Sequence, residues 1–274
     1  MKRFIIPQRW ERIIDLVEER GGATVEQIAQ ALEISAATVR RDLVHVSNRG
    51  LVSRTRGGAA PSPQVRTGHT LAESRKINPT EKELIGRAAA QLVRSGDTLM
   101  IDGGFTTYQV ACQITASGIT VVTNSVDVVQ ALAGRRDVTM VVIGGGLNVE
   151  TGTIAGPMAA KQILQFGADR AILGADAISP KTGLSSPSAL TVQTKKAMIG
   201  RSREVVVVAD STKLGRVALY EVAPLDVVGT LVTDDRADES VLEAFRAAGV
   251  HVIVASGVEG RELLTTGEGV SSGH

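Results

Sequence analysis

The chain has 274 residues, enough for a small domain and a larger one that each bury a core of their own. Its 30 basic and 29 acidic side chains leave a formal charge of +1, so overall charge does not indicate a polyanionic partner. The single cysteine, Cys112, excludes an intramolecular disulfide framework and fits a reducing compartment. We find neither a signal-peptide pattern nor an apolar run of about 20 residues, and we expect a cytoplasmic protein without a membrane partner.

Three helices are predicted at the start of the chain. Apolar residues recur at helical spacing from Gln8 to Gly21. Thr24 and Gln27 have the spacing of a capping box and begin a short second helix. Ser35 is the expected cap of a third helix that ends near Arg49 and Gly50. A turn of about three residues between the last two helices is typical of a helix-turn-helix, whose second helix enters the major groove of DNA.

Residues 50–60, GLVSRTRGGAA, predict a two-stranded wing after the third helix. From Arg40 to Arg66 the only acidic residue is Asp42, which we expect to pair with Arg40 or Arg41. A solvated charged face and a plain hairpin are the simpler alternatives for this segment. We interpret it as a surface for double-stranded operator DNA, because arginine binds phosphate and guanine and glycine lets the backbone come close. The candidate DNA-binding residues are Ser35, Thr38, Arg40, Arg41, Arg54, Arg56, Gly57 and Gly58.

Residues 61–79 have the composition of a linker, with three prolines and little periodicity. We therefore predict a winged helix-turn-helix domain at 1–60, a larger domain at 80–255, and a flexible tail at 256–274 that is rich in Gly, Ser and Thr. In the larger domain helical and extended segments alternate, which favours a mostly parallel α/β sheet covered on both faces. Its predicted helices are 81–94, 106–116, 125–134, 157–166, 188–201 and 237–248, and its predicted strands are 98–102, 119–123, 138–143, 170–174, 205–208, 227–232 and 250–254.

Glycines and polar side chains follow several of these strands, at the edge where open parallel sheets gather their ligands. The loop from Asp102 to Thr107 opens a helix, and its amides and hydroxyls suit an anion such as phosphate. Residues 123–125, 144–146 and 174–176 end three further strands, and 209–213 closes a run of valines with an acid and a base. Each loop alone is weak support for a site, but together they indicate one.

Two motifs resemble a known family. TVRRDL at 38–43 and GLVSRTRGGA at 50–59 are similar to the N-terminal signature of DeoR-family repressors, and residues 80–255 resemble the effector domain of that family. The resemblance implies a fold like that of ribose-5-phosphate isomerase and CoA-transferase, and a sugar-phosphate pocket. The candidate effector-binding residues are Asp102, Gly103, Gly104, Thr106, Thr107, Asn124, Ser125, Gly145, Gly146, Glu150, Gly174, Asp176, Lys195, Asp210 and Lys213.

The sequence departs from the family pattern at four places. Arg56 stands where histidine is more frequent, and Phe105 stands where serine or threonine is usual. Asp176-Ala177 replaces Ser-Gly or Asp-Gly, and Gln193 replaces an acid before Lys195. An exchange of a hydroxyl for a ring, or of a charge for a neutral group, can change ligand preference by a few kcal/mol. These departures leave the effector's identity open.

The predicted function is repression of a carbohydrate-catabolism operon, with DNA affinity controlled by a phosphorylated sugar or related intermediate. We expect a homo-oligomer, a dimer or tetramer, because paired operator half-sites need two recognition helices. We expect no cofactor, metal or catalytic residue. One alternative is an isomerase-like enzyme in which Asp102, Glu150, Asp176 and Lys213 act as acids and bases. Another is a purely structural scaffold. The regulator is favoured because an isomerase gains nothing from a winged helix.

Overall fold

The computed structural model describes residues 6–48, 51–62 and 70–257. The predicted helix end at Arg49 and Gly50, the basic residue Arg66 and all but the first two residues of the predicted tail lie outside these ranges.

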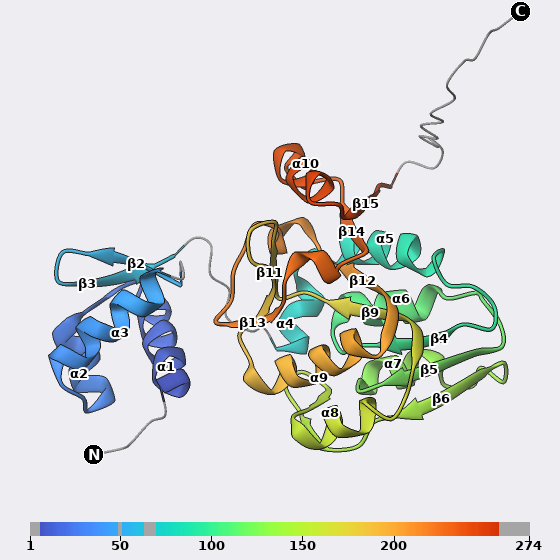
Figure 1. Ribbon diagram of the computed structural model, residues 1–274, viewed down its shortest axis with the longest axis horizontal. Coiled ribbons are helices and arrows are strands. Elements are labelled where there is room, and N and C mark those ends of the chain that lie inside the picture. Colours follow the sequence, from blue (N-terminus) through green and yellow to red (C-terminus); the bar gives the residue numbers. More distant parts are fainter. Residues whose placement is uncertain (1–5, 49–50, 63–69, 258–274) are drawn as a thin grey trace, which may run out of the picture.

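The N-terminal domain is a helix-turn-helix with a wing, as predicted (Figure 1). Its helices are α1 (Ile6–Glu19), α2 (Val25–Leu32) and α3 (Ala36–Asn48). The wing strands β2 (Val52–Thr55) and β3 (Gly58–Pro61) are antiparallel, and the unpredicted β1 (Ala23–Thr24) adds a third strand beside β3. The capping box of α2 is present in both halves: Thr24 Oγ1 accepts from Gln27 N at 3.2 Å, and Thr24 N donates to Gln27 Oε1 at 2.8 Å.

Asp42 does not pair with Arg40 or Arg41, so that prediction is wrong. Its buried carboxylate accepts hydrogen bonds from Arg9 at 2.5 and 2.9 Å and from the indole Nε1 of Trp10 at 3.1 Å. Arg40 instead lies 3.7 Å from Glu26. The physical reason is helix geometry, because adjacent residues on a helix point to different faces and only the third and fourth neighbours meet. Asp42 therefore ties α3 to α1.

Asp42→Ala is expected to destabilise the N-terminal domain. The change leaves the donors of Arg9 and Trp10 without their acceptor, and loss of one partner of a buried ion pair costs about 3–5 kcal/mol. Because the Arg9 side chain is 17% exposed, we expect about 2–3 kcal/mol. Trp10 is the only tryptophan, so its fluorescence during urea unfolding reports this domain. Glu26→Ala removes an exposed pair and should change stability by less than about 0.5 kcal/mol; equal effects of the two changes would contradict the assignment.

The C-terminal domain contains a seven-stranded sheet with the order β15-β14-β12-β9-β4-β5-β6, and all of its pairings are parallel. This confirms the predicted mostly parallel α/β class. The strands are β4 (Thr98–Ile101), β5 (Ile119–Thr123), β6 (Val138–Val142), β9 (Ala168–Gly174), β12 (Ser202–Val208), β14 (Thr230–Asp234) and β15 (His251–Ala255).

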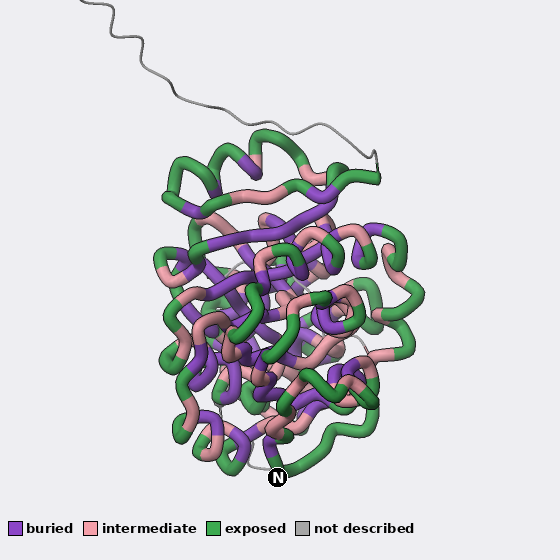
Figure 2. Tube along the Cα trace, turned by 90° about the vertical axis from the view of Figure 1, so that its right-hand side faces the viewer, coloured by how far each residue is buried: buried purple, intermediate pink, exposed green. Residues whose placement is uncertain are grey.

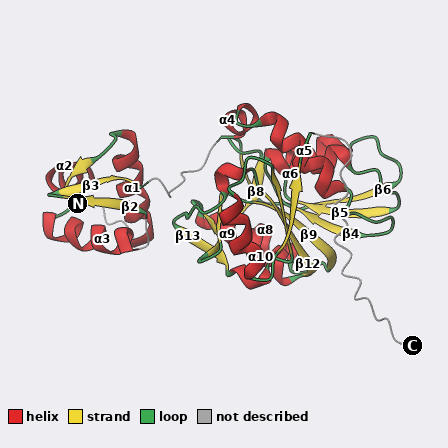
Figure 3. Cartoon of the chain, turned by 90° about the horizontal axis from the view of Figure 1, so that it is seen from above, coloured by secondary structure: helices red, strands yellow, loops and turns green. Residues whose placement is uncertain are grey.

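Helices cover both faces of this sheet (Figure 3). One apolar core joins it to α5 (Pro79–Ala90), α6 (Phe105–Gln113) and α7 (Val126–Leu132). The other core joins it to α8 (Pro157–Ile163), α9 (Ala189–Gly200) and α10 (Glu239–Ala247). The central strands are buried and exposure is concentrated at the periphery (Figure 2). This is the arrangement that the β-branched runs predict. None of the described helices is long and apolar enough to cross a membrane.

Several short elements were not predicted. A hairpin, β7 (Gly146–Asn148) and β8 (Thr153–Ala155), follows β6. A small antiparallel sheet is formed by β10 (Ala177–Ser179), β11 (Gly183–Ser186) and β13 (Tyr220–Ala223). Two 3-10 helices cover Ser211–Lys213 and Leu225–Val227. Part of the predicted linker forms α4 (Leu71–Lys76), which is capped by Thr70 and lies against the larger domain.

The two domains touch at β13. The Tyr220 phenol donates a 2.8 Å hydrogen bond to the carboxylate of Glu11 on α1, and Leu219 is buried in the core of the N-terminal domain. Figures 1 and 3 both place the N-terminal domain beside β13. Burial and the Glu11 carboxylate raise the pKa of Tyr220, so the phenol keeps its proton and remains a donor.

Candidate DNA-binding surface and effector pocket

Helix α3 presents its arginines away from the domain core. Val39 and Leu43 are buried, whereas Arg40 and Arg41 are exposed on the other side of the helix. Ser35 caps this helix, because its Oγ accepts from Thr38 N at 3.2 Å and lies 2.9 Å from Thr38 Oγ1. Both hydroxyls therefore fix the helix start, next to the exposed arginines.

The two glycines of the wing, Gly57 and Gly58, have different structural roles. Arg54, Arg56 and Gly57 are exposed, and Gly57 has a φ of 88° at the hairpin turn, where a Cβ would be strained. Gly58 is buried, and a Cβ there would lie 2.2 Å from the carbonyl oxygen of Ala23. The sequence interpretation placed Gly58 where the backbone of the wing comes close to DNA. In the structure Gly58 is instead required because the backbone of β1 lies against it.

A cavity of about 130 Å³ lies at the carboxyl ends of β4 and β9, between α4, α6 and α9. The structure therefore brings polar groups from distant parts of the chain to the predicted edge of the sheet. Eight predicted effector residues line the cavity, namely Asp102, Gly103, Gly104, Thr106, Gly174, Asp176, Lys195 and Lys213.

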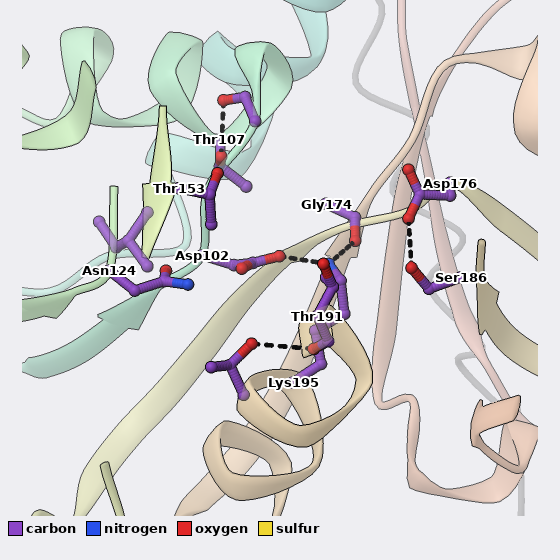
Figure 4. Close-up of polar contacts among 12 residues, drawn as sticks. Asp102, Thr107, Asn124, Thr153, Gly174, Asp176, Ser186, Thr191 and Lys195 are labelled. Atoms are coloured by element: carbon purple, nitrogen blue, oxygen red, sulfur yellow. Dashed lines mark hydrogen bonds and ion pairs between the residues drawn. The ribbon is translucent and has the colours of Figure 1, made fainter. Parts of the chain in front are cut away.

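Lys195 and Asp102 form a buried ion pair at the base of the cavity (Figure 4). Lys195 Nζ donates to Asp102 Oδ2 and, at 2.6 Å, to the carbonyl oxygen of Gly174. The other oxygen, Asp102 Oδ1, is buried and has no hydrogen-bond partner among the described residues. An unpaired buried acceptor is costly, so a hydroxyl of a bound molecule would satisfy it favourably.

The opposite wall carries Asp176, whose carboxylate accepts a 2.8 Å hydrogen bond from Ser186 of β11 (Figure 4). Thr191 of α9 and Lys213 of the first 3-10 helix also line the cavity. Carboxylate, hydroxyl and ammonium groups thus surround a small volume, which suits a polyol with an anionic group.

The N-terminus of α6 opens into the same cavity. Gly104 occupies its N-cap position with a φ of 136° and, as a glycine, has no side chain that could cap this helix. A Cβ on Gly103 would lie 2.3 Å from Thr153 Oγ1, so close packing requires a glycine there. In contrast, Ser125 caps α7 and Ser188 caps α9. The first-turn amides of α6 suit an anion, which the helix dipole also favours.

Sequence reasoning missed Lys82, which is 2% exposed and lines the cavity. Its Nζ donates to Ser74 O at 2.7 Å and lies 3.9 Å from a carboxylate oxygen of Asp210. A signal was present, because Lys82, Ile85 and Ala89 share one helical face, on which a lysine must be buried. Also missed were Leu71, Ser74, Thr151, Thr153, Ala175 and Thr191, while Phe105 had been noted only as a departure from the family.

Seven predicted effector residues do not line the cavity. Thr107 donates to Gly104 O at 2.8 Å, Asn124 donates to Ile154 O at 2.9 Å, and Ser125 caps α7. Asp210 lies behind Lys82, where it binds Asn78. Gly145, Gly146 and Glu150 are exposed in the β7 hairpin region. Gly145 and Gly146 were chosen because they follow strand β6, which is the edge strand of the sheet, and Glu150 was chosen from the family resemblance. The hairpin reaches the cavity through Thr151 and Thr153 instead.

Comparison with known proteins matches both domains. The model of the DeoR-like helix-turn-helix domain matches residues 9–64, and that of the DeoR C terminal sensor domain matches residues 77–235. An HTH-type transcriptional regulator GlpR of Haloferax volcanii is 32% identical over 90% of this chain and 96% of that protein. The glycerol-3-phosphate regulon repressor of Escherichia coli (strain K12) is 35% identical over 86% of this chain and 94% of that protein.

The search of solved structures found ribose 5-phosphate isomerase A of Methanocaldococcus jannaschii at 18% identity, with a TM-score of 0.36 over 50% of this chain and 55% of that chain. A structural similarity this weak does not support an assignment of function. The two family models and the full-length relatives decide between the regulator and the enzyme. The chain belongs to the DeoR family of DNA-binding transcriptional regulators, and it is a regulator and not an isomerase.

Proposed function

We propose that this chain represses an operon of carbohydrate or polyol metabolism, and that a small phosphorylated intermediate controls its affinity for operator DNA. The observation that carries the effector's chemistry is the N-terminus of α6, whose cap residue Gly104 has no side chain and which lines one cavity together with Lys213. Amides at a helix start and a lysine are a suitable receptor for a phosphate dianion. Lys82 lines the same cavity, but it already donates to Ser74, so we assign it to the positive charge of the wall. The relatives named above include a repressor of a glycerol-3-phosphate regulon, which fits this chemistry.

The remaining cavity groups would bind the hydroxylated part of the effector. Asp102 Oδ1 needs a donor, and Asp176 and Thr191 supply further polar contacts. Lys195 is already engaged by Asp102 and Gly174, so we assign it to positioning Asp102. In this arrangement the phosphate binds toward α6 and the hydroxyls bind toward β9 and α9.

Two structural connections support control of DNA binding by the cavity. First, α4 lines the cavity through Leu71 and Ser74, and it is the first described element after the wing. Second, Asp176 binds Ser186 on β11, and Ser186 pairs with Tyr220 on β13, the residue that binds Glu11 of α1. An effector that contacts Ser74 or Asp176 would therefore act on elements joined to the N-terminal domain.

The DNA-binding part of the proposal assigns Arg40 and Arg41 of α3 to the major groove and Arg54 and Arg56 to the wing contact. Two recognition helices at fixed spacing are needed for a paired operator, so we propose a homo-oligomer, a dimer or tetramer, in the cytoplasm. Its effector would change the relative orientation of the paired recognition helices and release the operator.

The proposal predicts specific and salt-dependent binding to the promoter region of the chain's own operon. A mobility-shift titration of the full chain should show preference for this fragment over random DNA, and affinity that falls steeply with salt. Addition of a phosphorylated polyol or sugar should then reduce the shift. Equal affinity for random fragments would overturn the operator assignment, and operator affinity that no phosphorylated compound changes would overturn the effector assignment.

A further inference from the structure

We infer that the effector is a compact, three-carbon polyol phosphate or keto phosphate, and that the Phe105 side chain excludes phosphates of six-carbon sugars. This inference rests on the proposed function and adds the size class of the ligand. The two observations behind it are the volume of the cavity and the large side chains that line it.

The cavity is small for a sugar phosphate. Its volume is about 130 Å³, whereas pockets for drug-sized ligands usually measure about 300–1,000 Å³. The phosphate at the start of α6 would occupy part of this volume, which leaves space for a short carbon chain between Asp102 and Asp176. A six-carbon sugar phosphate carries three more carbons with their hydroxyls, and those groups need more volume than this cavity provides.

Phe105 is the largest side chain that lines the cavity. It is the first residue of α6, so its backbone amide belongs to the proposed phosphate site while its ring lines the cavity. A serine or threonine at this position would have a much smaller side chain. The phenylalanine ring therefore occupies volume next to the proposed phosphate site, where the carbon chain of the effector begins.

The ring of Phe105 is held in place from several sides. It stacks on Tyr108, with 5.6 Å between ring centroids and 20° between planes. The cationic groups of Arg75 and Lys82 each lie 5.9 Å from its centroid, within the range of cation–π attraction. Arg75 is itself fixed by a 3.0 Å ion pair with Asp127. A larger ligand would have to disrupt these contacts to displace the ring.

Leu71 extends the wall from the side of α4. Its backbone amide donates a 2.8 Å hydrogen bond to Glu150 O, so the start of α4 is attached to the loop between β7 and β8. Its side chain lines the cavity and packs near Gly152, where a Cβ would lie 3.4 Å from Leu71 Cδ2. Phe105 and Leu71 are the two large apolar side chains of the cavity lining, next to polar groups that would bind a short polyol.

The test is a calorimetric titration of the full chain with phosphates of increasing carbon number. Glycerol 3-phosphate and dihydroxyacetone phosphate should bind, and glucose 6-phosphate and fructose 6-phosphate should bind about tenfold or more weakly, the discrimination that a filled pocket gives. Phe105→Thr should reduce this difference by about tenfold by strengthening hexose phosphate binding. Phe105→Leu, a milder change, should act in the same direction. Leu190→Thr is the matched control, an apolar-to-threonine exchange at an exposed residue that does not line the cavity.

The outcomes separate the two proposals. Stronger binding of hexose phosphates by the unchanged protein, or a preference that neither Phe105 variant alters although both melt like the unchanged protein, would overturn the size inference. The proposed function would survive if those hexose phosphates also released operator DNA. If none of the four phosphates binds and none changes operator affinity, the proposed effector site fails, and the size inference fails with it.

Discussion

Arg41→Ala is expected to weaken operator binding by about 1–3 kcal/mol, or roughly 5- to 150-fold, while effector affinity stays unchanged. Arg41 is exposed on α3, whose opposite side is buried through Val39 and Leu43, so its guanidinium is available to the major groove. Fluorescence anisotropy with labelled operator measures the loss. Arg203→Ala is the matched control, since Arg203 is an 85% exposed arginine in the sensor domain.

The salt dependence of the Arg41 variant identifies its contact. If Arg41 binds a phosphate, the slope of log affinity against log salt should decrease by about one, and weakening should be uniform across sequences. If Arg41 reads a guanine, discrimination against the wrong base should fall at one operator position. Operator affinity equal to that of the Arg203 variant would contradict the assignment of α3 as the recognition helix.

Lys213→Ala should have the reverse effect, a loss of effector affinity with normal operator binding when no effector is present. Lys213 lines the same cavity as the start of α6, and a hydrogen bond to a charged group contributes about 1.5–3 kcal/mol, or roughly 10- to 150-fold in affinity. Calorimetry measures this change, with the phosphorylated polyol or sugar that most strongly reduces operator binding as the ligand. Lys161→Ala on α8 is the control, because Lys161 is exposed and does not line the cavity.

The Arg41 and Lys213 variants together test whether operator binding and effector binding belong to separate domains. Operator titrations in the presence of effector should show that the Lys213 variant needs more effector for release, in proportion to its lost affinity. If both variants impaired both operator and effector binding to the same degree, the separation into a DNA-binding domain and a sensor domain would be wrong.

The sequence by itself determined the elements whose stability is local. Thr24 and Gln27 form the capping box that their spacing predicts, and the strand predicted at 119–123 coincides with β5. These features depend on hydrogen bonds and apolar periodicity within about ten residues, which the order of residues encodes directly. The same reasoning placed Asp102, Gly174 and Lys213 near a common site, because the carboxyl ends of parallel strands meet at one edge.

Only the tertiary structure decided which side chains meet. Lys195 reaches Asp102 across 93 residues, Arg9 replaces the helical neighbours as the partner of Asp42, and Tyr220 reaches Glu11 in the other domain. The small sheet of β10, β11 and β13 escaped prediction because its strands are short and are defined by long-range pairing. Lys82 and Leu71 line the cavity for the same reason, since α5 acquires its position by packing on the sheet and α4 by packing on α6. The cavity therefore depends on contacts between distant segments, which local periodicity does not specify.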